Sequence, residues 1–191
     1  MYYAIYKNIR NSSWKCLLDF ELTSLPIDIL KVTRSAGIKV IRNSIVNDLL
    51  PGENGKAYFD GECWRIIYND SNPTELSRFT IAHELGHIFL GHELTHKKYA
   101  QAREFTSKPK SEEQADQFAI RLLCPACVLW GLDLHTPNEI AKYCKVDMEI
   151  ASIRAKRMKT LYAREKFLAD PLEKEVFNRF NFYIEKCENN Y

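Results

Sequence analysis

The stretch from Asn72 to Gly91 limits the possible folds of this chain more than any other. It opens with the signals of a helix start: an asparagine cap, a proline in the first turn and an acid three residues after the cap. Apolar residues then recur nearly all round the helical wheel, namely Phe79, Ile81, Leu85, Ile88 and Phe89. A helix that is apolar on almost every side is a buried helix, so we expect the other elements to pack around it.

This predicted helix carries the motif H-E-x-x-H at His83, Glu84 and His87. Histidines at positions i and i+4 lie on one helix face, so both imidazoles can reach one tetrahedral metal ion. Glu84 falls beside that face, where it could take a proton from a metal-bound water as a general base. The motif arises by chance in roughly one chain in a hundred of this kind, and the alternative is a buried helix whose histidines are satisfied core residues.

A catalytic zinc ion needs a third protein ligand. An extended motif would place a histidine at position 93, but that residue is Glu93. The next predicted helix, 111–123, offers Glu112 and Glu113. At ~100° per residue, Glu112 lies about 60° from the centre of its apolar face and Glu113 about 160°. We therefore predict Glu112 as the ligand, with Asp116 supporting the site one turn later; alternatively, both glutamates only favour the helix N-terminus, and Glu113 stays open as the ligand.

Two segments together resemble a known family: FTIAHELGHIFLGH from Phe79 to His92, and EEQADQFAIRLLCP from Glu112 to Pro125. They look like the motifs of the ImmA/IrrE family of zinc metallopeptidases, with Cys124 where that family more often has methionine. The resemblance implies a zincin-like core, a bound Zn²⁺ and a cytoplasmic enzyme. It also implies a typical role, which is to cleave a helix-turn-helix repressor and so release genes of a mobile element or a stress response.

Local patterns outside these motifs predict an α+β fold with a small antiparallel sheet near the N-terminus. A helix capped by Thr23 or Ser24 should run to Gly37, with a short strand following at 38–41. Strands at 56–59 and 62–68 flank Asp60-Gly61, which indicates a two-residue hairpin turn.

The rest of the chain is predicted to be helical. Further helices should begin at the capping residues Thr136, Asp147 and Asp170. We expect residues 1–125 to form the metallopeptidase core and residues 126–191 a helical extension packed on it.

Composition excludes few classes of protein but indicates the cellular compartment. With 191 residues the chain suits one domain, or one domain with a helical appendage, and a net charge of +2 implies no general attraction to nucleic acid or membranes. From the N-terminal residues we expect no secretory signal, and the 6 cysteines are widely spread. Free thiols in a reducing compartment, the cytoplasm, are therefore expected.

Several weaker signals have ordinary explanations. Cys124 and Cys127 form a lone C-x-x-C, which we interpret as a buried or incidental pair. His92, His96 or Tyr99 could stabilise an oxyanion; a solvated loop is the alternative for His96, and His92 could support the ligands instead. His135 is interpreted as a structural residue.

The segment 136–166 has a helix-turn-helix outline with a basic second helix. It could bind DNA or dock a protein partner, or simply expose a solvated face. This leaves a second class of function, a metal-binding regulatory or DNA-binding module without hydrolysis. Glu84 favours the peptidase, because a structural zinc site needs no base.

We predict that the substrate binds along the strand that ends just before the helix of the H-E-x-x-H motif. We expect an extended peptide to add to Cys63–Tyr68 as an edge strand, because such binding reads the main chain. Specificity would then come from the loop 93–110 and the basic helix near Arg154. The predicted outcome is a single cut in one regulator and little digestion of unfolded protein.

Overall fold

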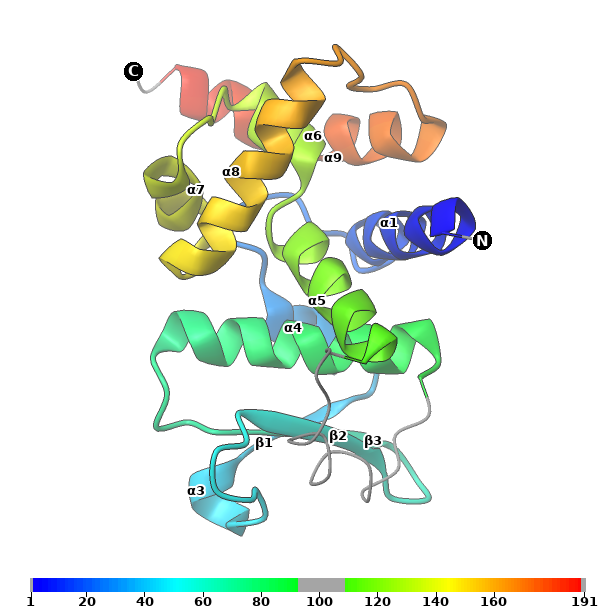
Figure 1. Ribbon diagram of the computed structural model, residues 1–191, viewed down its shortest axis with the longest axis vertical. Coiled ribbons are helices and arrows are strands. Elements are labelled where there is room, and N and C mark those ends of the chain that lie inside the picture. The colour runs from blue at the N-terminus through cyan, green and yellow to red at the C-terminus, as the bar shows by residue number, and fades with distance from the viewer. Residues whose placement is uncertain (1, 93–108, 190–191) are drawn as a thin grey trace.

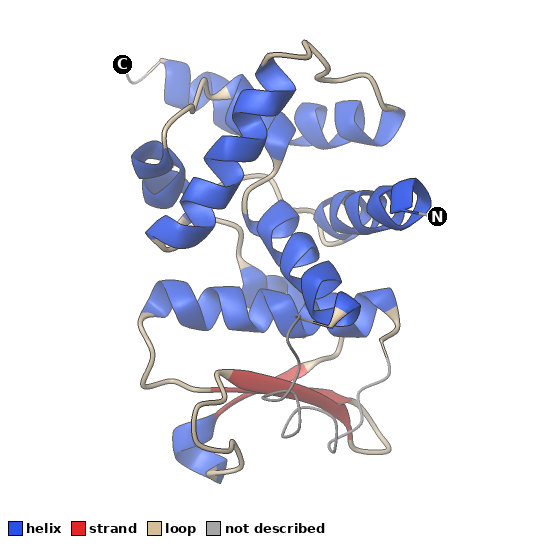
Figure 2. Cartoon of the chain, viewed as in Figure 1, coloured by secondary structure: helices blue, strands red, loops and turns tan. Residues whose placement is uncertain are grey.

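The computed structural model describes residues 2–92 and 109–189, and its architecture is α+β, as predicted. A small sheet lies at one end with the short helix α3 beside β1, α4 lies across the sheet, and most of the other helices stack on the far side of α4 (Figure 1). Figure 2 shows how far helix dominates outside this sheet. The elements in chain order are α1 (Tyr2–Asp19), α2 (Ile29–Ser35), β1 (Lys39–Arg42), α3 (Asn43–Val46), β2 (Gly55–Phe59), β3 (Trp64–Tyr68), α4 (Thr74–Leu90), α5 (Lys110–Leu123), α6 (Ala126–Gly131), α7 (Pro137–Cys144), α8 (Met148–Tyr162) and α9 (Pro171–Glu188).

The sheet is mixed, which corrects the antiparallel prediction. Its strand order is β1-β3-β2, with β1 parallel and β2 antiparallel to β3. The β2–β3 connection is also longer than the two residues predicted, because Phe59 pairs with Trp64. Asp60 organises this loop, since its carboxylate accepts the backbone N–H groups of Glu62 and Cys63 at 2.9 Å each.

Strand β3 is the central strand, so the prediction that it is a free edge for substrate is wrong. Among the described residues the outer strands of the sheet are β1 and β2, and β2 is the one that directly precedes β3 in sequence. The ladder between β2 and β3 extends through the hydrogen bonds Asp60 N–H to Cys63 (3.2 Å) and Asn69 N–H to Asn54 (2.8 Å). Hydrogen-bonded pairs alternate in an antiparallel ladder, so the odd-numbered residues of β2, Ala57 among them, point their backbone N–H and C=O groups away from β3.

Helix boundaries follow the predicted caps in the second half of the chain and depart from them in the first. Thr136 forms a complete capping box, and Asp147 and Asp170 cap α8 and α9. Helix α2, however, starts only after Asp28, whose carboxylate accepts the Lys31 N–H at 2.9 Å. Helix α4 starts at Thr74 rather than directly after the predicted cap at Asn72.

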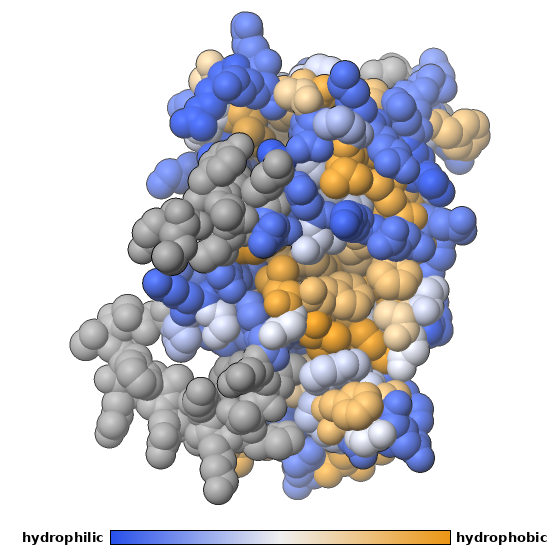
Figure 3. All heavy atoms as spheres, turned by 90° about the vertical axis from the view of Figure 1, so that its right-hand side faces the viewer, coloured by the Kyte–Doolittle hydropathy of each residue, from blue (hydrophilic) through white to orange (hydrophobic). Residues whose placement is uncertain are grey.

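Helix α1 was not predicted and closes one side of the core. It packs against α5 and α9, burying Trp14 and Leu17. An ion pair of 2.7 Å between Arg10 and Asp170 joins it to the start of α9. A band of apolar side chains remains visible on the face that lies to the right in Figure 1 (Figure 3).

None of the helices in the described residues combines the length and apolar character needed to cross a membrane.

Arg78 connects α4 to two distant segments. Its guanidinium donates to the backbone oxygen of Ile27 at 2.9 Å, just before α2. It also donates to the oxygens of Cys144 (3.5 Å) and Lys145 (3.2 Å), where α7 ends. Helix carbonyls lack intrahelical partners in the last turn, so a side chain of α4 satisfies the end of α7.

Candidate metal centre

Helix α4 turns its H-E-x-x-H face toward α5. His87 is fully buried and His83 is partly buried, and their Nε2 atoms lie 3.0 Å apart. One helical turn separates the two residues, so the predicted convergence of both imidazoles follows from the helix itself.

Helix α5 brings the carboxylate of Glu112 to the same point. The two helices approach closely because α4 has no side chain at Gly86, where a Cβ atom would lie 3.1 Å from the backbone of Ala115. Glu112 Oε2 lies 3.3 Å from His83 Nε2, and Oε1 lies 3.2 Å from His87 Nε2. Glu113 is exposed, so the helix-face argument placed both glutamates correctly.

The donor set has the chemistry and the spacing of a zinc site. One ligand atom from each of His83, His87 and Glu112 lies within 4.8 Å of the others. Zinc binds imidazole nitrogen and carboxylate oxygen at about 2.0–2.2 Å in tetrahedral geometry, which sets neighbouring ligand atoms about 3.3–3.6 Å apart. The two Nε2 atoms lie 3.0 Å apart, and each has a different oxygen of Glu112 at 3.2 or 3.3 Å, so a small outward movement of these groups would admit a zinc ion.

The carboxylate at the centre of this cluster is stabilised by a positive charge close to it. Glu112 Oε1 is buried and lacks a hydrogen bond of good geometry within the described residues. Burial raises the pKa of Glu112, but the neighbouring imidazoles of His83 and His87 outweigh burial, so the pKa lies well below its usual range. Burial likewise lowers the pKa of His83, yet hydrogen bonds to Asp116 and Glu112 outweigh it and raise the pKa to about 9. Without a metal, a proton on His83 therefore supplies the charge that the carboxylates need.

Contacts behind the two histidines orient both rings. Asp116 Oδ1 lies 2.8 Å from His83 Nδ1, as its predicted supporting role requires. Behind His87, His92 Nδ1 lies 3.1 Å from His87 Nδ1. His92 in turn places its Nε2 2.9 Å from the side-chain oxygen of Gln114. Both ligand rings thus have their Nδ1 atoms engaged and their Nε2 atoms directed at Glu112.

Glu84 lies beside the cluster and is buried against the sheet. Burial raises its pKa, while the charges of His83 and His87 and a hydrogen bond from the backbone of Ala57 lower it in part. Because Ala57 belongs to β2, an edge strand of the sheet as the described residues form it, this hydrogen bond holds the carboxylate beside both that edge and the cluster of His83, His87 and Glu112. A carboxylate with a raised pKa is suited to accept a proton near neutral pH.

Residues 33–156 match the sequence profile of the Peptidase M78 family, described as the IrrE N-terminal-like domain. The chain belongs to the ImmA/IrrE family. The match spans most of the chain and includes α4 and α5, the two helices that carry the clustered ligand atoms. The protein is therefore a metallopeptidase of the ImmA/IrrE type. No curated protein matches the sequence closely enough to add a named relative.

Two residues that sequence analysis considered for this ImmA/IrrE site, His96 and Tyr99, lie outside the described residues. Gln114 was not anticipated. It lies two positions after Glu112, which on a helix is about 200° away, so periodicity gave no reason to place both near the same histidines. The turn that follows α4 brings His92 to Gln114 and makes the contact possible.

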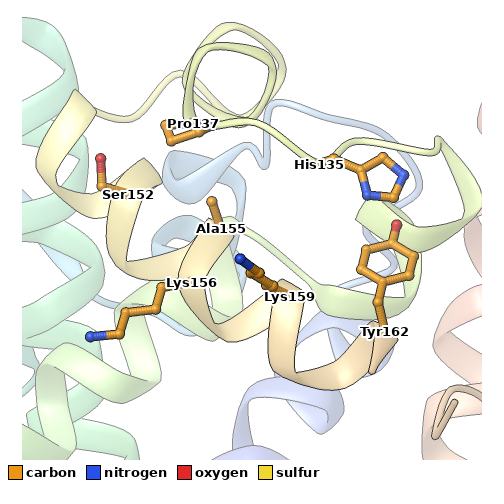
Figure 4. A pocket seen from close by; sticks show the side chains of 7 residues that line it. All are labelled: His135, Pro137, Ser152, Ala155, Lys156, Lys159 and Tyr162. Atoms are coloured by element: carbon orange, nitrogen blue, oxygen red, sulfur yellow. The ribbon is translucent and has the colours of Figure 1, made fainter. Parts of the chain in front are cut away.

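The residues of the weaker sequence signals, the two cysteines and His135, are not part of the metal cluster of this ImmA/IrrE protein. Cys124 and Cys127 are buried free thiols, as expected of an incidental pair. His135 stacks on Tyr162 with 4.4 Å between ring centroids and pairs with Asp133. These two rings line a shallow hollow between α7 and α8, toward which Lys159 also projects (Figure 4).

Proposed function

We propose that this protein is a zinc-dependent endopeptidase that makes a site-specific cut in a helix-turn-helix transcriptional repressor. Such a cut would derepress genes of a mobile element or a stress response. The observation that carries the hydrolytic part is the meeting of three ligand atoms from His83, His87 and Glu112 beside a buried glutamate, Glu84. The repressor as substrate is supported by membership of the family.

Each residue of the site has a distinct task in this proposal. His83, His87 and Glu112 would hold the zinc ion, which supplies Lewis acidity to polarise a peptide carbonyl and to acidify water. Glu84 would accept the proton of the attacking water and later deliver it to the leaving amine. Its burial favours this exchange, because a carboxylate with a raised pKa both takes and returns a proton near neutral pH.

The edge strand β2 is the surface on which we now place the substrate backbone. Its odd-numbered residues direct N–H and C=O groups outward, and the outward groups that Glu84 does not engage can pair with an extended peptide. The hydrogen bond between Ala57 and Glu84 puts this edge next to the proposed base. The basic helix near Arg154 remains a candidate source of specificity, although Arg154 itself is buried.

The proposal also includes the setting and the domain division. All six cysteines are free thiols, in keeping with a reducing compartment such as the cytoplasm. We propose residues 1–125 as the catalytic core and residues 126–191 as an extension that rests on it.

The test compares two variants of the zinc-loaded protein. Glu84→Gln removes the base but no proposed ligand, so it should keep zinc and lose hydrolysis, whereas the exposed Glu113→Gln should cleave normally. Each protein is incubated with the product of a neighbouring repressor gene and with an unfolded casein-like substrate, and fragments are identified by mass spectrometry. A single cut in the repressor supports the proposal. Normal cleavage by Glu84→Gln would refute the mechanism, and cleavage of no repressor would favour a non-hydrolytic metal-binding regulator.

A further inference from the structure

His92 is held behind His87 by both backbone and side chain. Helix α4 ends with Gly91 in the left-handed region at φ 68°, and the His92 N–H then bonds the carbonyl oxygen of His87 at 3.0 Å. With the bond from Gly91 N–H to Ile88 at 3.2 Å, this is the pattern of a Schellman turn. The turn folds the chain back, so the His92 ring meets the Nδ1 side of the His87 ring.

Hydrogen-bond donors and acceptors can be assigned from the far end of this contact chain. The side-chain oxygen of Gln114 can only accept, so His92 Nε2 must carry the hydrogen that joins them at 2.9 Å. A neutral His92 then has its lone pair on Nδ1. The 3.1 Å contact with His87 Nδ1 therefore requires His87 to donate.

We propose that His92, oriented by Gln114, is a positioning residue that fixes the tautomer of His87 so that its Nε2 lone pair faces the metal. The inference rests on the proposed metal site. The opposite assignment, in which His92 carries hydrogens on both nitrogens, places the hydrogen of His87 on Nε2. That hydrogen would point at the other ligand atoms, and His87 could not bind a metal ion there.

The two histidine ligands are thus oriented by different chemistry. Behind His83 stands the carboxylate of Asp116, 2.8 Å from Nδ1, which is the usual arrangement for a metal-binding histidine. Behind His87 stands a neutral imidazole, which fixes the hydrogen without adding negative charge. A second carboxylate at that place would weaken the positive field of the ion, which acidifies water.

The experiment reads the tautomer directly by ¹⁵N NMR of the histidine side chains, in the metal-free and the zinc-loaded protein. The wild type should show His87 with its hydrogen on Nδ1 in both states. His92→Ala should give a mixture of tautomers in the metal-free protein and weaken zinc binding about 10- to 100-fold. His92→Gln should restore most of both properties, because its amide oxygen can accept the same hydrogen. His135→Ala, a histidine far along the chain, should change neither.

Each alternative outcome overturns the inference. A hydrogen on Nε2 of His87 in the metal-free wild type would refute it, as would an unchanged tautomer in His92→Ala. Gln114→Ala gives a second measurement if His92→Ala does not fold, since it leaves the turn intact and should also mix the tautomers. The tautomer is measured without substrate, so an inactive enzyme with the expected spectra would refute the proposed function and leave this inference standing.

Discussion

Replacing Gly86 by alanine should weaken metal binding while leaving the protein folded. A Cβ atom at this position would lie 3.1 Å from both the Cα and the carbonyl oxygen of Ala115. These are backbone atoms, so rotation of a side chain cannot relieve the overlap. Helix α5 must move away from α4, and Glu112 moves with it.

The size of the effect follows from these distances. Ordinary contacts of a Cβ atom begin near 3.4 Å, so the helices must part by about 0.3 Å at Gly86. Metal sites tolerate deviations of about 0.2 Å in ligand distance, so the Glu112 ligand would be strained. We expect about tenfold weaker zinc binding, equal to about 1.4 kcal/mol. Alanine in a helix gains about 1 kcal/mol over glycine and overpacking costs roughly 1–3 kcal/mol, so the free energy of unfolding should fall by about 0–2 kcal/mol.

Competition with a chromophoric chelator measures the zinc affinity, and urea denaturation of the metal-free protein measures the stability. The matched control is Gly37→Ala, at φ 69° with open space around it and far from the site in sequence. It should cost about 1–2 kcal/mol of stability through backbone strain and leave the zinc affinity unchanged. Wild-type zinc affinity in Gly86→Ala would show that the approach of α4 and α5 does not set the ligand geometry.

Two further predictions concern the ligands. Glu112→Ala should weaken zinc binding far more than Glu113→Ala, because only Glu112 faces the histidines; equal losses in the chelator assay would contradict the assignment. The pKa of His83 is raised from 6.5 to about 9, so its proton stabilises the metal-free fold fully below pH 6.5 and ceases to do so as the pH rises through 9. Zinc must displace that proton, so calorimetry at pH 6 in buffers of different ionisation enthalpy should show about one proton released per ion, and heat independent of the buffer would refute this.

The clustering of His83, His87 and Glu112 could be predicted from sequence because it depends on local helical periodicity. His83 and His87 share a face whenever their segment is helical, and the apolar pattern of the next helix was enough to separate Glu112 from Glu113. The position of His92 could not be predicted in the same way. Its contact with His87 depends on the left-handed turn at the end of α4, and its second contact on a neighbouring helix.

The arrangement of the sheet and the presence of the first helix could not be predicted from sequence, because both depend on non-local contacts. Strand β3 is central because the earlier strand β1 pairs beside it in parallel. No short-range sequence pattern shows this pairing. Asp60-Gly61 is typical of a two-residue turn, but the Asp60 side chain closes a longer loop. Helix α1 contains polar, weakly helix-forming residues such as Asn11, and its burial against α5 and α9 outweighs that local preference.

The Arg78 contacts described above make the metal helix part of a larger cooperative unit. Opening the end of α7 would leave a half-buried guanidinium without the carbonyl oxygens of Cys144 and Lys145, and its burial already lowers the pKa of Arg78. Removing a hydrogen-bond acceptor from a desolvated cation costs more free energy than an ordinary hydrogen bond contributes. Amide hydrogens at the end of α7 and at the start of α4 should therefore exchange with solvent at a common rate, although Arg78 is 66 and 67 residues away in sequence from the two residues whose oxygens it binds.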